Sequence, residues 1–339
     1  MKKFLFLSLS SLITLSAFST EHSKDSASFY LTKAINLKDS RKVWDAEKSF
    51  LKAIQFDPAD ANLRVEYGNH LVEQRKYFPA FEQFSKILEK NTNHLVALQK
   101  LTEISFTLRR WNDVIKYSAK VPTGTPKLNF MIGKSYYEIE NYGQAEKFLT
   151  AEVAANPRSF DAVSLLGKVY IELSNYKHAI ALYNKALNMD PNNNQMIYEL
   201  GLLYYTMNNE KEAVKYFELA IAKGYKKDLD VMENIGLACL SFDIKKGVEI
   251  LSQVMTMKPG NPEILFQIAQ AYFKIAKFQD AADTFKKIYE ADPSNTRALY
   301  MQGIAYIKNG DKNKGTSICE QAIRLDPALA QLKSVKSTM

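Results

Sequence analysis

The stretch that decides the fold runs from Phe160 to Asn193 and reads FDAVSLLGKVYIELSNYKHAIALYNKALNMDPNN. Its first half carries an apolar stripe at the helical spacing i, i+4 and i+7, formed by Leu166, Tyr170 and Leu173. A second stripe follows the polar break Ser174-Asn175 and consists of Ala179, Tyr183 and Ala186. Asp190-Pro191 ends the second helix, because proline disfavours the helical conformation in the residue before it. The stretch therefore predicts two helices that pack antiparallel through their apolar stripes.

The order of small, aromatic and proline positions in this stretch matches a known repeat. If Phe160 is position 1, then Gly167 lies at position 8, Tyr176 at 17, Ala179 at 20 and Pro191 at 32. The stretch thus resembles a tetratricopeptide repeat, a helix–turn–helix of about 34 residues. Gly167 and Ala179 are small where the two backbones must approach closely. One helix pair cannot bury its own stripe, so neighbouring repeats must stack on it.

The pattern recurs over residues 27–329 and predicts an array of about nine repeats. They begin at or near Ala27, Ala61, Leu95, Pro126, Phe160, Asn194, Leu229, Pro262 and Thr296. The third repeat departs most, because Val121-Pro122 must end its second helix early. Gly224, near the end of the sixth, suits a left-handed helix C-cap. Residues 330–339 remain as a cap and tail, and Ala328 to Lys336 predict a short capping helix. The resemblance implies an all-α, right-handed superhelical solenoid.

The N-terminal segment is predicted to lie outside this array. Lys2-Lys3 precede an apolar run from Phe4 to Phe18, and small residues follow, which is the order found in a secretory signal peptide. We therefore expect residues 1–19 to be a signal peptide, cleaved near Ser19, and residues 20–26 to be a flexible segment. An uncleaved anchor is the alternative, although the run is shorter than the ~20 apolar residues that a membrane span needs. The chain then resembles exported bacterial proteins of this family, located in the periplasm or cell envelope.

Charge and residue usage point away from enzymatic chemistry. The net charge is +8, and lysines alternate with acidic residues, which favours a solvated helical surface over nucleic-acid binding. The two cysteines, Cys239 and Cys319, fall at core positions two repeats apart, so no disulfide is predicted. The histidines are scattered, and neither a zinc motif nor a phosphate-binding glycine loop is present. We expect no enzymatic activity, no cofactor and no metal.

The surface of the first helices remains as the candidate binding site. The resemblance implies that positions 2, 5, 9 and 12 of each first helix face a concave groove that holds a partner segment. The residues predicted to bind a partner there are Phe130, Lys134, Tyr137, Lys168, Ile171, Tyr198, Tyr205, Phe266, Phe273 and Tyr300. The alternative is that aromatic residues at positions 5 and 12 pack between neighbouring repeats.

Lys134 and Lys168 both lie at position 9, in adjacent first helices that stack roughly 10 Å apart. Two cations in a mostly apolar trough could hold an acidic side chain or a terminal carboxylate. The alternative is that they pair with Glu138 and Glu172, four residues further along each helix.

The sequence therefore predicts a non-enzymatic scaffold or adaptor that binds another protein or a peptide, with no nucleic acid and no membrane span after signal cleavage. A recruiting or specificity subunit of a cell-envelope enzyme complex is the alternative. An enzyme of unknown type would need a convergent polar pocket, which this spacing does not supply.

Overall fold

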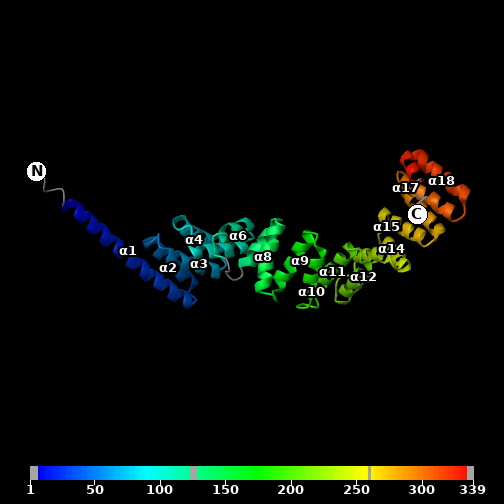
Figure 1. Cartoon of the computed structure of the whole chain (residues 1–339). Helices are drawn as coiled ribbons and strands as arrows, with labels where there is room; N and C mark the ends of the chain where they lie inside the picture. The colour runs from blue at the N-terminus through cyan, green and yellow to red at the C-terminus, as the bar shows by residue number, and fades with distance from the viewer. Residues whose placement is uncertain (1–6, 123–127, 259–260, 334–339) are drawn as a thin grey trace. The chain divides into compact units, whose positions relative to one another are not determined.

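The computed structural model describes residues 7–122, 128–258 and 261–333, with side chains from Ser23 to Gln331 in these ranges. This part of the chain forms 18 α-helices and one 3-10 helix and contains no strand (Figure 1). The chain divides into two compact units, Met1–Asn175 and Tyr176–Met339, called unit 1 and unit 2 below. Both are all-helical, as expected of a helical repeat solenoid.

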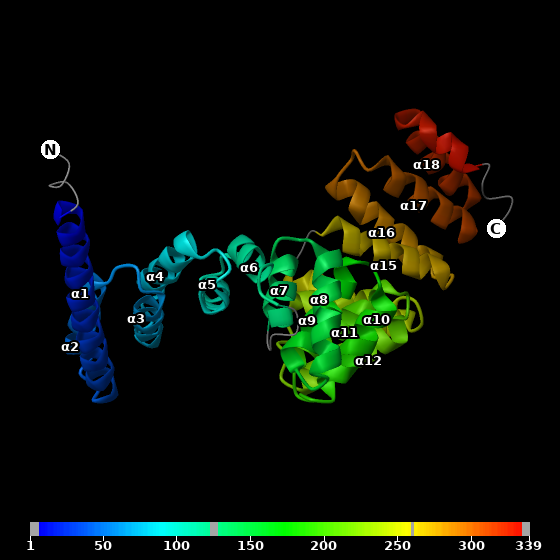
Figure 2. The same cartoon turned by 60° about the vertical axis from the view of Figure 1, so that its left-hand side comes forward.

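Unit 1 consists of nine helices (Figure 2): α1 (Leu7–Asp39), α2 (Val43–Phe56), α3 (Ala61–Glu73), α4 (Tyr77–Lys90), α5 (Leu95–Thr107), α6 (Trp111–Ser118), α7 (Leu128–Glu138), α8 (Tyr142–Ala155) and α9 (Phe160–Glu172). Unit 2 consists of α10 (Tyr176–Leu187), α11 (Asn194–Thr206), α12 (Glu210–Ala222), α13 (Leu229–Cys239), α14 (Ile244–Met257), α15 (Pro262–Lys274), α16 (Phe278–Ala291), α17 (Thr296–Lys308), α18 (Lys312–Leu325) and the 3-10 helix η1 (Pro327–Lys333). Within each unit, consecutive helices contact one another in pairs, which confirms the predicted helix–turn–helix repeats.

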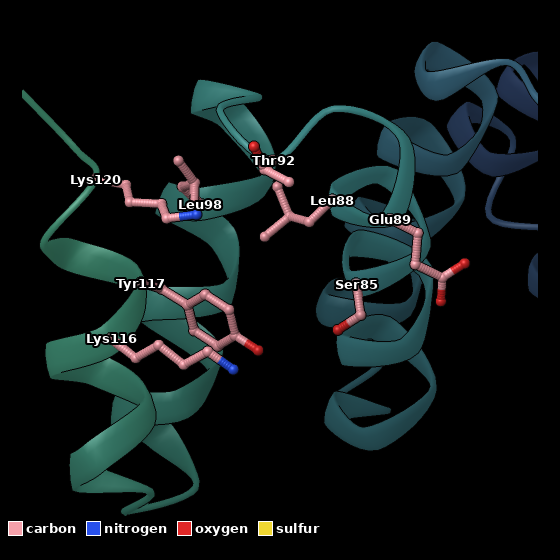
Figure 3. A pocket seen from close by; sticks show the side chains of 8 residues that line it. All are labelled: Ser85, Leu88, Glu89, Thr92, Leu98, Lys116, Tyr117 and Lys120. Atoms are coloured by element: carbon pink, nitrogen blue, oxygen red, sulfur yellow. The ribbon is translucent and has the colours of Figure 1, made fainter.

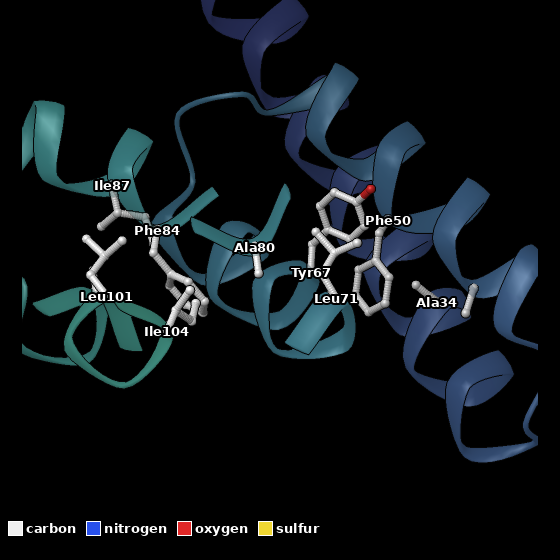
Figure 4. Close-up of a cluster of buried hydrophobic side chains, with 11 residues drawn as sticks. Ala34, Phe50, Tyr67, Leu71, Ala80, Phe84, Ile87, Leu101 and Ile104 are labelled. Atoms are coloured by element: carbon white, nitrogen blue, oxygen red, sulfur yellow. The ribbon is translucent and has the colours of Figure 1, made fainter. Parts of the chain in front are cut away.

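One core position recurs in the second helix of each repeat. In seven repeats it is filled by a large side chain that is at most 1% exposed, and in the third and ninth by the smaller Ser118 and Cys319; the large ones are Phe50, Phe84, Leu149, Tyr183, Phe217, Leu251 and Phe285. In unit 1, Phe50 lies with Tyr67 and Leu71 of α3, and Phe84 lies with Leu101 and Ile104 of α5, in one cluster (Figure 4). Each second helix thus buries its apolar stripe against the next repeat, which is why single repeats are not stable alone.

The turns between paired helices share a left-handed residue. Backbone φ is positive at Arg41, Arg75, Arg109, Glu140, Ser174, Asn208, Ala276 and Gly310. Each lies between the first and second helix of a repeat, and the turn 240–243 of the seventh repeat has no such residue. Gly224, at the end of α12, has a φ of 93°, which confirms the predicted left-handed C-cap.

Two departures from the regular pattern follow from local sequence. Helix α6 has 8 residues whereas α4 and α8 have 14, which confirms the early end predicted for the third repeat. The predicted C-terminal cap is a 3-10 helix, η1, and Leu329 on it is buried against α17 and α18. Residues 334–339 of the predicted tail lie outside the described part of the chain.

The N-terminal helix is longer than expected. We predicted a flexible segment at 20–26, but α1 runs without a break from Leu7 to Asp39, a stretch that contains neither glycine nor proline. The Ser23 hydroxyl donates to the Phe56 carbonyl at 2.5 Å, so this part of α1 contacts the end of α2. No helix in the described residues is long and apolar enough to cross a membrane.

Candidate functional site

A cavity of about 340 Å³ opens on the first helices of unit 1, where the groove was predicted. It lies where α5, α7 and α9 come together, and it is lined by Phe106, Phe130, Lys134, Asp161, Ser164, Leu165 and Lys168. These residues occupy positions 2, 5, 6, 9 and 12 of their repeats. Since first helices stack in register, the same positions of successive repeats face the same side.

The two lysines of this cavity differ in their partners. Lys134 is half-buried; its Nζ lies 2.8 Å from Glu138 Oε1 and 5.9 Å from the centre of the Trp111 ring. Lys168 is exposed, and no carboxylate of the described residues lies within ion-pair distance of it. The pairing that we weighed as an alternative therefore occurs for Lys134 with Glu138 and does not occur for Lys168 with Glu172. The cavity keeps one cation available to a ligand.

An aromatic group forms one wall. The Phe106 ring lies edge-on to Trp111, with centroids 5.8 Å apart, and edge-on to Phe130 at 6.3 Å. Leu165 is 8% exposed and forms the apolar floor. Together these side chains can cover an apolar residue of a ligand while Lys168 meets a neighbouring carboxylate.

Four lining residues, Phe106, Asp161, Ser164 and Leu165, were not among the predicted contacts, and two of these are polar. Asp161 is exposed in the first turn of α9 and adds a negative charge to the same cavity. Ser164 donates its hydroxyl to the Phe160 carbonyl at 2.7 Å, so its oxygen can still accept a hydrogen bond. Asp161 stands at groove position 2, and that count was the signal that could have identified it.

Phe130, Lys134 and Lys168 line the same cavity, whereas two other predicted residues of unit 1 do not. Tyr137 is half-buried, with its ring 5.8 Å from that of Tyr142. Ile171 is half-buried as well. Neither lines the cavity, whose only position-12 residue is Phe106 of the preceding repeat.

In unit 2, burial argues against two predicted contacts. Tyr198 is 9% exposed; its ring stacks on Tyr225 at 4.5 Å and its oxygen accepts from Asn234 Nδ2 at 2.8 Å. Tyr300 is 1% exposed and lies in the core with Leu299 and Cys319. Both follow the alternative that aromatic residues at position 5 pack between repeats, so their assignment as partner contacts is corrected.

The other aromatic residues predicted in unit 2 are more accessible. Tyr205 lines a cavity of about 480 Å³ together with Glu233, Leu237, Leu240, Ser241, Glu263, Ile264 and Gln267. Phe266 and Phe273 are half-buried and lie outside it; Phe266 packs edge-on to Phe285 at 5.4 Å, and Phe273 packs edge-on to Phe278 at 5.2 Å. The cavity at Tyr205 is lined by two carboxylates, those of Glu233 and Glu263, whereas the cavity of unit 1 is lined by two lysines. Burial raises the pKa of the Tyr205 hydroxyl, with a smaller contribution from Glu210.

A third cavity, of about 320 Å³, lies between α4 and α6 (Figure 3). Its walls are Ser85, Leu88, Glu89, Thr92, Leu98, Lys116, Tyr117 and Lys120. It exists because α6 ends at Ser118 and leaves the C-terminal half of α4 uncovered. The Ser85 hydroxyl is buried without a hydrogen-bond partner. The short third repeat was the sequence signal for this feature, although we did not predict a cavity from it.

No group of histidine, cysteine or acidic residues in the described part of the chain could hold a metal ion. Cys239 and Cys319 are both buried, and the Cys319 thiol lies 3.6 Å from the Tyr300 carbonyl oxygen. Burial raises the pKa of the Cys239 thiol, so it behaves as a small apolar side chain.

Comparison with known families finds three matching segments. Residues 167–208 match a model described as TPR repeat, and residues 195–222 and 266–330 match models described as tetratricopeptide repeat. No curated protein matches the sequence.

Several solved structures are similar to this chain. The C-terminal part of a TPR repeat-containing protein from Cytophaga hutchinsonii is 19% identical with a TM-score of 0.47, over 78% of this chain and 95% of that one. A tetratricopeptide repeat protein from Parabacteroides merdae is 16% identical with a TM-score of 0.45, over 73% and 99%. YrrB, described as a TPR protein with an unusual peptide-binding site, is 21% identical with a TM-score of 0.45, over 56% and 97%.

Proposed function

Since this chain is a tetratricopeptide-repeat protein, we propose that it is a non-enzymatic adaptor that binds an acidic segment of a partner protein in the cavity of unit 1. Repeats of this family generally mediate protein–protein interactions through extended surfaces of this kind. The observation that carries the proposal is Lys168, an unpaired cation beside an aromatic wall at a position that faces the groove.

The contacts define the partner segment. A carboxylate next to Lys168 would make a charge-assisted hydrogen bond, which is stronger than a neutral one. Lys134 already pairs with Glu138, so it adds a weaker attraction unless Glu138 is displaced. An apolar residue beside that carboxylate would cover the rings of Phe106 and Phe130. A backbone or side-chain donor next to it would meet Asp161.

Site-specific photo-crosslinking tests this proposal in the living cell. A benzophenone amino acid in place of Phe130 should capture the partner, and mass spectrometry should find an acidic residue within a few residues of the crosslink. The same group in place of Phe242, an exposed ring in unit 2, is the control position. Capture at Phe242 of the same segment, or a segment at Phe130 with no acidic residue, would contradict the proposal.

We further propose that the chain is exported, with residues 1–19 removed, and acts in the periplasm or cell envelope. The order of cationic, apolar and small residues in this segment supports the proposal. In that location the captured partner would be another envelope protein, and an envelope enzyme would identify the chain as its recruiting subunit. N-terminal sequencing of the native protein tests export, since a chain that still begins at Met1 and stays in the cytoplasm would rule it out.

A further inference from the structure

Three successive turns of unit 1 carry the same short motif, two cations followed by an aromatic residue. The turn from α1 to α2 contains Arg41-Lys42-Val43-Trp44, that from α3 to α4 contains Arg75-Lys76-Tyr77-Phe78, and that from α5 to α6 contains Arg109-Arg110-Trp111. The fourth turn, Glu140-Asn141-Tyr142, has lost both cations. We call the eight residues Arg41, Lys42, Trp44, Arg75, Lys76, Phe78, Arg109 and Arg110 the basic–aromatic edge.

The arginines of this edge occupy a backbone conformation that does not favour them. Arg41, Arg75 and Arg109 have φ values of 58°, 57° and 55°. Glycine adopts this left-handed region without penalty, and Gly310 does so at the corresponding turn of the ninth repeat. The same conformation occurs at the corresponding turns with Glu140, Ser174, Asn208 and Ala276, so what distinguishes the first three turns is that each carries an arginine there.

Contacts place the three turns along one side of unit 1. Lys76 Nζ lies 2.7 Å from Glu47 Oε2 on α2, and the Arg110 guanidinium lies 4.5 Å from the centre of the Phe81 ring on α4. The second and third turns thus each lie against the second helix of the preceding repeat. Successive turns of the basic–aromatic edge are therefore neighbours.

The cations of this edge outnumber the carboxylates that could neutralise them. The acidic residues nearby are Asp39, Asp45, Glu47, Glu73 and Asp113. Three of these carboxylates are already in ion pairs, Glu47 with Lys76, Glu73 with Lys38 and Asp113 with Arg110. Within the described residues no ion pair involves Arg41, Lys42, Arg75 or Arg109, and all four are exposed.

Trp44 and Phe78 project from the same edge. They are 76% and 70% exposed, the highest fractions among the large apolar side chains that the structure describes. Both stand second in their helices, and one residue separates each from the preceding pair of cations. Exposed aromatic rings beside arginine and lysine are typical of segments that lie at the interface of an anionic lipid bilayer.

We propose that the basic–aromatic edge binds the surface of an anionic membrane, with Trp44 and Phe78 at the level of the lipid headgroups. The unpaired arginines and Lys42 provide the electrostatic attraction, and the two rings provide the apolar contact. The headgroup region of a bilayer is fluid, so lipids can surround isolated aromatic rings that protrude from a protein surface. None of the eight residues lines the cavity of unit 1, although the third turn borders it through Trp111, which packs on Phe106.

Fluorescence provides a direct test, because the chain has two tryptophans. In the full chain with Trp111→Phe, Trp44 is the only tryptophan and reports on the proposed surface. Vesicles of phosphatidylcholine with about 30 mol% phosphatidylglycerol should shift Trp44 emission to the blue, and added salt should reverse the shift. Vesicles of phosphatidylcholine alone should leave it unchanged. Equal binding to both vesicles, or binding without a Trp44 shift, would overturn the proposal.

A triple variant separates surface charge from folding. Arg41→Gly, Arg75→Gly and Arg109→Gly together should weaken binding to the anionic vesicles at least about tenfold. Thermal stability should stay the same or rise, because glycine relieves the left-handed backbone. Ala276→Gly, at the equivalent turn of unit 2, is the matched control and should leave vesicle binding unchanged. Undiminished vesicle binding by the triple variant would show that the N-terminal apolar segment or another surface binds the lipid.

Discussion

His70 lies in the core of unit 1 without a hydrogen bond to either ring nitrogen. It is 1% exposed, and its ring centre lies 5.3 Å from that of Phe50. Burial lowers its pKa; Glu73 and Glu47 oppose this shift, and Lys38 and Lys76 add to it. The neutral ring packs as an aromatic side chain, whereas the protonated ring would be a buried cation. His70 therefore ties the stability of this unit to pH.

The direction of the effect follows from the lowered pKa. The unfolded chain, whose histidine has an ordinary pKa near 6.5, binds the proton more readily than the folded chain. Above about pH 6.5 the free energy of unfolding of unit 1 should have its full value, because His70 is then neutral in the folded and the unfolded chain. As the pH drops below this value, the free energy of unfolding should fall. His70→Leu should remove this part of the pH dependence. Urea unfolding at several pH values measures the difference, and identical curves for His70→Leu and the native chain would contradict the assignment.

Single residues also show why part of the site could be predicted and part could not. Phe130, Lys134 and Lys168 were found by counting repeat positions, because each first helix presents the same positions to the same side. Position 5 is not always exposed, since Tyr225 after α12 covers Tyr198. That contact involves a residue outside the repeat pattern, so counting could not reveal it.

At the scale of helices, α17 and α18 of unit 2 approach each other closely at two glycines. A Cβ atom on Gly315 would lie 2.5 Å from the Gly303 carbonyl oxygen and 2.7 Å from the Ile307 nitrogen. The two positions are those predicted to be small, 8 and 20 of the repeat. Because the obstructing atoms belong to the backbone, the helices themselves would have to separate.

Gly315→Ala should therefore destabilise the protein by about 1–3 kcal/mol, although alanine favours helix more than glycine does. Gly143→Ala is the matched control, because a Cβ there meets no atom within 4 Å and the residue is exposed on α8. This control should be neutral or stabilising by about 0.5–1 kcal/mol. Thermal unfolding of both variants checks the contrast, and equal midpoints would show that the helices separate freely.

At the scale of the whole molecule, the chain is a linear series of repeats in two compact units. The number of repeats and the short α6 could be predicted, because period and proline placement are properties of the sequence. The continuous α1 could not, since the predicted boundary at 20–26 depended on a processing site and no glycine or proline interrupts the helix. The three turns that form the basic–aromatic edge were visible in the sequence, but their exposure was not.

In such a series, repeats couple mainly to their neighbours. Loosening by Gly315→Ala should therefore stay local. Amide hydrogen exchange should accelerate in α17 and α18 and remain unchanged in α2 to α5 of unit 1. Uniform acceleration along the chain would indicate one cooperative unit instead of nearest-neighbour coupling.

The central claim is that the lysines of the unit 1 cavity hold an acidic partner segment. Calorimetric titration with the crosslinked segment as a synthetic peptide tests it most directly. Lys134→Glu with Lys168→Glu should weaken binding at least about tenfold, since the charged hydrogen bond from Lys168 contributes about 1.5–3 kcal/mol and Lys134 adds a weaker attraction. Lys147→Glu, an exposed lysine of α8 outside the cavity, should bind like the native chain, and the helical circular dichroism of both variants should be unchanged. If the double variant binds the peptide as tightly as the native chain does, this claim is contradicted.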